Sequence, residues 1–315
     1  SVEVQDCGGM TVLPGLIDCH VHLTMYFDAG LRLRNVTESN ELVTLRAAQY
    51  AKRTLEAGFT TVRDLGAQRP ETIFAVRDGV AQGLIVGPRI VAAGHPIAIT
   101  GGHGDFTNGY REDVWGMQTE EGGIADGPDS CMRAVREQIK RGADVIKLTA
   151  TGGVLSASAA GLRQHFTDEE LKAICTAAHM MGRKVAAHAH GADGIRAALA
   201  AGVDSIEHGT YLDEESIALI KGRGEKGPKA YLVPTMLAAE TVTANADKPG
   251  YYLPMVAAKA KLVGPRLKQA VRQAHEAGVP IAFGTDSGVS EHGLNGREFT
   301  LLVEAGLTPT ETIVA

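Results

Sequence analysis

The sequence predicts an α/β fold of the (β/α)8 TIM-barrel class, in which eight parallel strands alternate with helices. Three observations lead to this prediction. The chain has 315 residues, a length that one such barrel commonly occupies. A unit of amphipathic helix, glycine and short β-branched strand recurs along the chain. Single ionisable side chains follow several of these strands at similar distances from the glycine.

The repeating unit appears around five glycines, Gly58, Gly142, Gly182, Gly202 and Gly278. Each glycine is expected to end a helix and turn the chain into the next strand. Helices that alternate with strands predict parallel βαβ units. The intervals from Gly58 to Gly142 and from Gly202 to Gly278 are each about twice the usual unit, so one further strand is expected in each.

Three more strands complete the expected eight. They are predicted at residues 16–23, 88–94 and 230–234. Thr167 and Glu170 form a capping-box pattern ahead of an apolar helical repeat, which predicts the start of a helix.

Two long stretches, residues 100–128 and 237–252, look irregular. The first is rich in Gly, His and Asp and follows the third expected strand, so it is expected over the C-terminal mouth of the barrel. Long irregular loops in compact domains are usually functional, although a tolerated surface insertion is the alternative.

Both ends suggest a fragment of a longer chain. The sequence opens with Ser1, so a signal peptide upstream would have been lost. Near the other end, Thr308, Pro309 and Glu311 form a capped helix start only a few residues before the sequence stops. The compartment stays open: cytoplasmic or, with a lost signal, periplasmic or secreted.

The composition is that of an ordinary globular protein, with 44% hydrophobic and 22% charged residues. A net charge of −6 without long single-sign runs argues against a nucleic-acid partner. No apolar run reaches the length of a membrane span, so no membrane partner is expected. The four cysteines are scattered and are expected to be reduced packing residues.

Four of the expected strands end in one ionisable side chain each. Lys147 lies five residues after its glycine, and His188 and His208 lie six residues after theirs. Asp286 lies eight residues after its glycine. The carboxyl ends of all barrel strands meet at one rim, which is where the active site of this fold lies. We therefore expect these four side chains to converge.

His20 and His22 end the first expected strand and share one face of it, because side chains alternate along a strand. With the four side chains above they form a set of imidazoles and a carboxylate that suits Zn²⁺, with Mn²⁺, Fe²⁺ or Co²⁺ as alternatives. Lys147 fits such a set only when deprotonated, and becomes a good ligand as a carbamate formed with CO₂.

Each of these residues alone has an ordinary structural explanation. A His-x-His pair arises by chance, a strand-end Lys147 is often an ion-pair partner, His188 a core histidine and Asp286 a helix N-cap. Their joint occurrence at matching depth in the strands argues against these explanations.

Five segments of the sequence resemble the amidohydrolase superfamily, in its binuclear branch with a carboxylated lysine: LPGLIDCHVHL (13–23), GADVIKLTATGGV (142–154), VAAHAHG (185–191), DSIEHGT (204–210) and AFGTDSG (282–288). The resemblance implies two divalent metal ions and a carbamate on Lys147. It implies that the metal ligands are His20, His22, Lys147, His188, His208 and Asp286. It also implies that residues 1–12 are a remnant strand of an N-terminal β-sandwich, and that residues 13–315 form a barrel with an incomplete C-terminal end.

Within the superfamily the sequence is most similar to metallopeptidases of the Xaa-Pro dipeptidase and Lys/Arg carboxypeptidase type. TGGHGD (100–105), AAHAHGADGI (186–195) and the GTDSG segment followed by His292 carry this likeness. Residues 221–230 and 237–252 depart from the pattern, which puts the substrate in doubt.

The resemblance predicts a mechanism in which a hydroxide that bridges the two metals attacks an amide carbonyl. Asp286 is expected to take the proton of the attacking water and to deliver it to the leaving amine. His103 and His190 are expected to bind substrate, and Tyr211 to donate its hydroxyl to the tetrahedral oxyanion. A surface role for each of these three residues is the alternative.

The predicted function is hydrolysis of an amide or peptide bond next to a C-terminal residue, by a dipeptidase, carboxypeptidase or N-acyl-amino-acid amidase. A cyclic-amide hydrolase or a deaminase-type amidohydrolase is the alternative, although Lys147 argues against a deaminase with one metal. A non-catalytic metal-binding barrel is the third reading. The expected partner is a dipeptide or another small molecule, and a homo-oligomer is compatible with the sequence.

Overall fold

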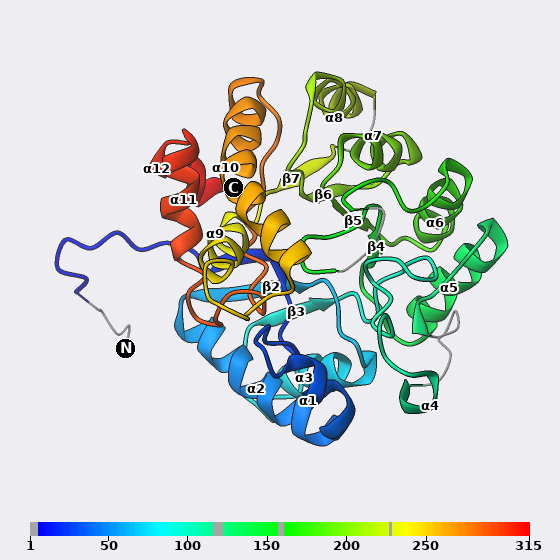
Figure 1. Cartoon of the computed structure of the whole chain (residues 1–315). Coiled ribbons are helices and arrows are strands. Elements are labelled where there is room, and N and C mark those ends of the chain that lie inside the picture. Colours follow the sequence, from blue (N-terminus) through cyan, green and yellow to red (C-terminus); the bar gives the residue numbers. More distant parts are fainter. Residues whose placement is uncertain (1–5, 116–121, 157–160, 227–228) are drawn as a thin grey trace.

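The computed structural model describes residues 6–115, 122–156, 161–226 and 229–315, and helices surround the strands in it (Figure 1). The described strands are β1 (Leu16–Val21), β2 (Phe59–Asp64), β3 (Arg89–Ala92), β4 (Ile146–Thr149), β5 (Val185–Ala189), β6 (Ser205–His208) and β7 (Tyr231–Val233). The described helices are α1 (Leu31–Thr37), α2 (Asn40–Glu56), α3 (Pro70–Ala81), α4 (Glu112–Trp115), α5 (Pro128–Lys140), α6 (Asp168–Met180), α7 (Ala192–Ala201), α8 (Glu214–Lys226), α9 (Met236–Asn245), α10 (Pro254–Glu276), α11 (Arg297–Ala305) and α12 (Pro309–Val314).

The described strands form two parallel sheets, in the orders β1-β2-β3 and β4-β5-β6-β7. Neighbouring strands pair in register over most of their length; for example, Lys147 lies beside Ala186, and Ala189 lies beside His208. The parallel pairing confirms the α/β class. Because all strands run the same way, their carboxyl ends lie on one side of the molecule.

Backbone hydrogen bonds link the two sheets on both sides. On one side the Ile97 amide donates to the Lys147 carbonyl at 2.8 Å, and the Thr149 amide donates to the Ile97 carbonyl at 3.0 Å. On the other side, residues 280–282 pair with Leu232 of β7, and residues 283–287 pair with β1.

The eighth expected strand, around residues 279–286, is not a regular strand. It makes only isolated bridges, Leu232 with Ile281 and Val21 with Ser287. Pro280 has no amide hydrogen to donate to a ladder. Asp286 has a φ of 58°, which takes it out of strand geometry.

The helix boundaries follow the sequence signals. The capping boxes at Thr167 and Thr308 are both present, with Glu170 and Glu311 as their third residues. All five glycines of the repeating unit have a positive φ, as expected for a helix end. The two hidden strands appear as β3 and β7 within the expected ranges.

The prediction that residues 237–252 are irregular is wrong for its first part, because α9 occupies Met236–Asn245. The sequence of α9 hides its helical period because buried residues occur on more than one face of it. One face packs against α10 and α11. Another lines the cavity described below.

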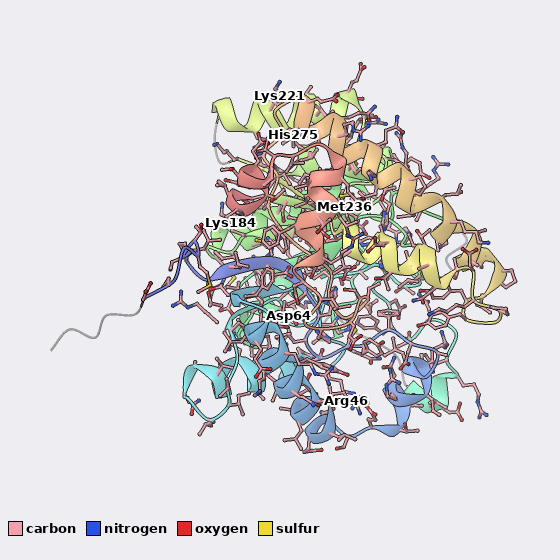
Figure 2. All side chains as sticks on the ribbon, turned by 90° about the vertical axis from the view of Figure 1, so that its left-hand side faces the viewer. Arg46, Asp64, Lys184, Lys221, Met236 and His275 are labelled. Carbon is pink, nitrogen blue, oxygen red and sulfur yellow. The ribbon has the colours of Figure 1, made fainter. Side chains whose placement is uncertain are left out.

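Residues 6–15 contain a turn but no strand, and residues 1–5 lie outside the described residues. The part of this segment that the structure describes extends away from the body of the molecule in two views (Figures 1 and 2). The assignment of residues 1–12 to a β-sandwich stays a prediction. Cys131 and Cys175 are buried in the hydrophobic core. None of the described helices combines the length and the apolar character needed to cross a membrane.

Candidate metal centre

The carboxyl ends of the strands surround one cavity of about 1060 Å³. It is lined by every metal ligand predicted from the sequence: His20, His22, Lys147, His188, His208 and Asp286. His103 and His190 line it as well. The side chains that were expected to converge therefore do so.

The first group of potential ligands consists of His20, His22 and Asp286, whose donor atoms all lie within 4.8 Å of one another. Oδ1 of Asp286 lies 3.5 Å from Nε2 of His20 and 3.1 Å from Nε2 of His22. The Asp286 amide donates to the His20 carbonyl at 2.7 Å. The irregular segment after Pro280 is thereby fixed directly against the end of β1.

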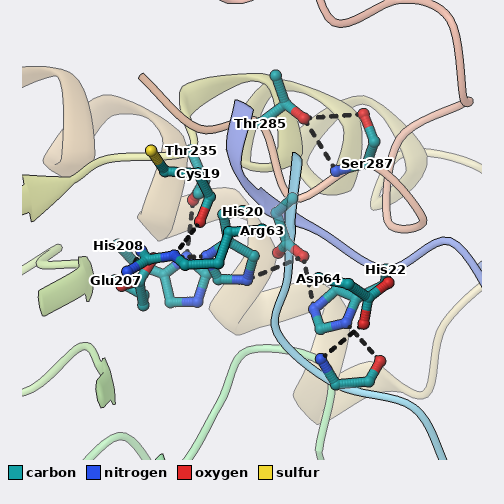
Figure 3. Close-up of polar contacts among 12 residues, drawn as sticks. Cys19, His20, His22, Arg63, Asp64, Glu207, His208, Thr235, Thr285 and Ser287 are labelled. Carbon is teal, nitrogen blue, oxygen red and sulfur yellow. Dashed lines mark hydrogen bonds and ion pairs between the residues drawn. The ribbon is translucent and has the colours of Figure 1, made fainter. Parts of the chain in front are cut away.

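Two buried partners orient the imidazoles of this first group (Figure 3). Nδ1 of His20 lies 2.8 Å from Oε2 of Glu207, which accepts its proton. Nδ1 of His22 lies 2.9 Å from the carbonyl of Gly66 and donates to it. In both rings this directs Nε2 toward Asp286, where it can ligate a metal once it carries no proton.

Glu207 is fully buried and also accepts a hydrogen bond from Arg63 at 2.9 Å. Burial raises the pKa of Glu207, but the charge of Arg63 and the bond to His20 outweigh it and bring the pKa to about 2. Glu207 is therefore a carboxylate under ordinary conditions and holds the His20 ring in one tautomer.

The second group of potential ligands consists of His188, His190 and His208, again with donor atoms within 4.8 Å of one another. Nδ1 of His208 lies 2.7 Å from Oγ1 of Thr235, and the Thr235 hydroxyl donates to the carbonyl of Pro234. Thr235 therefore accepts the Nδ1 proton of His208. The rings of His20 and His208 are 5.2 Å apart, so the two groups adjoin.

Lys147 is buried in the same cavity, with 4% of its surface exposed. Burial lowers its pKa to about 8, and Glu207 and Asp286 oppose this shift through charge alone. A neutral amine is thus within reach at physiological pH. A neutral amine is also the form that combines with CO₂.

Apart from His22, whose pKa is lowered by burial but raised overall by its contact with Asp286, the histidines of the cavity favour the neutral form that binds metals. Burial lowers the pKa of His20 to about 4 and takes the pKa values of His188 and His208 well below their usual range. Neutral imidazoles, a carboxylate and a lysine at the ends of different strands suit divalent transition metals. The residues present therefore fit the ions that the sequence implied.

Three residues of this centre are held in the left-handed backbone region: His208 with φ 71°, Thr235 with φ 54° and Asp286 with φ 58°. Within the described chain they are the only non-glycine residues with a positive φ. Such conformations are costly and cluster at functional sites.

His103 and Tyr211 differ in their placement. His103 is half-buried, and its ring stacks on His188 with 4.2 Å between the ring centroids. Its Nδ1 atom is buried without a hydrogen-bond partner. The ring of Tyr211 instead lies against the guanidinium of Arg266, 5.4 Å from it, and Tyr211 is not among the residues that line the cavity. Its role as an oxyanion donor stays a prediction.

Sequence reasoning missed the residues that support the ligands. Glu207 carried a usable signal, because it is an acid inside an otherwise apolar strand. Glu298 had no signal in its own sequence neighbourhood. It is buried on α11, and its two carboxylate oxygens accept hydrogen bonds from the amides of Met236 and Leu237 at 2.9 and 2.7 Å. This contact fixes the start of α9 and, with it, Thr235 next to His208.

Lys259 on α10 was missed too. Its Nζ atom donates to the carbonyls of Gly153 and Ser156, at 2.7 and 2.6 Å, in the loop that follows β4. Its charge acts on both His103 and His190. In the same loop, the amide of Gly152 donates to the Arg163 carbonyl at 3.0 Å.

Comparisons with known proteins agree with this geometry. A family model described as "Amidohydrolase family" matches residues 11–314. The ochratoxinase of Aspergillus niger is 36% identical over 320 residues, which cover 96% of this chain and 63% of that protein. The chain therefore spans less than two thirds of the length of that relative.

Two solved structures are similar over nearly the whole chain. A Xaa-Pro dipeptidase with methionine bound in its active site gives a TM-score of 0.89 at 41% identity, over 95% of this chain and 73% of that chain. A prolidase complexed with N-methylphosphonate-L-proline gives a TM-score of 0.82 at 31% identity, over 99% of this chain and 76% of that chain. The chain belongs to the amidohydrolase family, a family of hydrolytic enzymes.

Proposed function

We propose that the protein hydrolyses an amide bond next to a C-terminal residue that carries a free carboxylate, as a dipeptidase, carboxypeptidase or N-acyl-amino-acid amidase. The observation that carries this proposal is the convergence of two adjoining ligand groups on one large cavity, with Lys147 buried among them. The two sheets, linked by backbone hydrogen bonds on both sides, would form the (β/α)8 barrel that holds the site.

Two divalent ions, of which Zn²⁺ suits the donor set best, would supply an activated water and polarise the scissile carbonyl. His20, His22 and Asp286 would hold one ion, and His188 and His208 the other. Lys147 would help to hold the ions as a carbamate: its neutral amine would add to the carbon of CO₂, an N–C bond would form while one C=O π bond breaks onto oxygen, and one proton would leave to water.

Asp286 would act as the base and then the acid. Burial raises its pKa, but the imidazoles of His20 and His22 outweigh this and lower it. An ionised Asp286 accepts the proton of the attacking water and later gives it to the departing amine nitrogen, which leaves with both electrons of the broken C–N bond.

The leaving residue would lie toward the loops that follow β3, β4 and β5. His103 and His190 offer ring nitrogens there, and Lys259 provides positive charge nearby. These groups suit a carboxylate and do not suit a free amine. The prolidase described above was solved with N-methylphosphonate-L-proline, a ligand that ends in proline and so places a carboxylate on the leaving-residue side.

Converting the substrate's terminal carboxylate to an amide should lower kcat/KM by at least about 30-fold, since losing a buried charge-assisted contact costs about 2–5 kcal/mol. The experiment is a screen of dipeptides and N-acyl amino acids, each beside its C-terminal amide, with the zinc-loaded protein. Equal cleavage of acids and amides would exclude this polarity and favour a cyclic-amide hydrolase.

His190 provides a test of which histidines bind metal, because the structure groups it with His188 and His208. We expect His190→Asn to retain two metal ions per chain and to raise KM, whereas His188→Asn should lose one ion. Metal content is measured by elemental analysis after gel filtration. Loss of one ion from the His190 variant would make His190 a ligand and not a substrate contact.

A further inference from the structure

We infer that the acyl part of the substrate is a bulky apolar group without a charged amine, so that N-acyl amino acids with large acyl groups are preferred over dipeptides. This inference rests on the proposed function and concerns the part of the cavity wall that lies beside Asp286 and along α9 and α10. Three observations support it. The wall beside Asp286 is apolar, the carboxylates that line the cavity already have partners or belong to the proposed metal site, and the cavity is large.

Apart from the potential metal ligands, the residues of the cavity wall beside Asp286 are apolar. Val289 follows Asp286 by three residues, and the Phe27 amide donates to the Gly288 carbonyl at 2.7 Å. The wall continues across α9 and α10, and it includes Phe27, Ala239, Val242, Tyr251, Val256 and Val289. Because Thr235 at the start of α9 holds His208, the first turns of this helix lie beside the ligand groups.

The α-ammonium of a dipeptide would lie two bonds from the scissile carbonyl, and it would need an anionic partner once removed from water. Among the described residues that line the cavity, the carboxylates are Asp28, Asp105 and Asp286. Asp28 pairs with Arg34 at 2.8 Å. Asp105 accepts hydrogen bonds from its own loop, from the amides of residues 101 and 107.

Asp286, the third carboxylate, belongs to the proposed metal site and is committed to ligation and proton transfer. An ammonium on the acyl side would therefore face an apolar wall, with no free carboxylate among the described residues that line the cavity. The same wall favours a hydrocarbon or aromatic group, since burial of apolar surface is favourable at about 25 cal/mol per Å².

The size of the cavity supports a large acyl group. Pockets of roughly 300–1,000 Å³ hold drug-sized ligands, and this cavity of about 1060 Å³ reaches the upper end of that range. A dipeptide of small residues would leave much of the apolar wall in contact with water only.

The test compares two substrates that differ only in the amine. With one leaving residue taken from the screen above, kcat/KM is measured for the 3-phenylpropanoyl derivative and for the L-phenylalanyl dipeptide. We expect the first to be preferred at least 10-fold at pH 7. The gap should narrow as the pH rises through the dipeptide's α-amino pKa, about 7.7–8.0, because the neutral amine needs no anionic partner.

A second series tests the size of the acyl group. The 2-naphthoyl derivative should exceed the acetyl derivative at least 10-fold in kcat/KM. Filling the wall with Ala239→Phe, or separately with Val242→Phe, should lower this ratio at least 10-fold. Leu262→Phe adds a large side chain to an exposed position of α10 outside the cavity and should leave the ratio unchanged.

Each result decides between outcomes. Equal rates for the phenylalanyl and phenylpropanoyl substrates, or for the acetyl and naphthoyl substrates, would overturn the inference and leave the proposed function in place. Failure to cleave any substrate with a free terminal carboxylate would overturn the proposed function, and the inference with it.

Discussion

Lys147→Ala should lose roughly 10³-fold in kcat/KM and at least one of the two proposed metal ions, since metal polarisation of a carbonyl contributes several kcal/mol. The reason is the position of Lys147: it is buried among both ligand groups and lines their shared cavity. Activity and metal content are measured on the same preparation. Lys172→Ala, an exposed position on α6, is the matched control and should change neither quantity.

Rescue by small carboxylic acids distinguishes a carbamate on Lys147 from a lysine with a purely structural role. Formate, acetate or propionate added to the Lys147→Ala protein should restore part of the activity and metal binding, because a free carboxylate can occupy the space of the missing bridge. Full activity of the unrescued variant, or a free ammonium at Lys147 in a metal-loaded crystal structure, would rule out the carbamate.

Asp286→Asn should lower kcat by roughly 10²–10⁴-fold, the usual contribution of a positioned acid–base group. The amide retains the shape of the side chain and one oxygen toward His20 and His22, but it cannot accept the proton of the attacking water. KM and the unfolding temperature should change little by comparison. The measurement is steady-state kinetics at saturating metal, with metal content determined in parallel.

Near wild-type turnover of the Asp286→Asn protein would mean that another group accepts the proton of the attacking water. Asp64 is the matched control: it is also a buried carboxylate, but it accepts hydrogen bonds from the amides of Leu23 and Gly66 and does not line the cavity. Asp64→Asn should therefore affect stability more than proton transfer.

The residues at the strand ends could be predicted from the sequence because their signal is local. A buried parallel strand is apolar, so one polar residue at its end is conspicuous, and the repeated glycine sets the depth. The prediction of a regular eighth strand was wrong, because residues 279–286 have the local composition of a strand. In the structure, contacts of Asp286 with β1 replace the regular ladder of hydrogen bonds.

The supporting residues could not be predicted because their partners are distant in sequence. Arg63 meets Glu207 across 144 residues and Glu298 meets Met236 across 62. No pattern in a single sequence encodes such pairs. The helix α9 was missed because its apolar residues are divided between the core and the cavity, which removes the one-sided period that marks a surface helix.

The left-handed backbone at His208, Thr235 and Asp286 lowers the stability of the fold at positions that the proposed chemistry needs. Conformations of this kind cost about 1–3 kcal/mol each, and glycine would remove most of that cost. A selection for heat resistance alone would therefore favour replacements at positions that the chemistry needs. Directed evolution of this enzyme should screen turnover together with stability and should look for stabilising changes far from the strand ends.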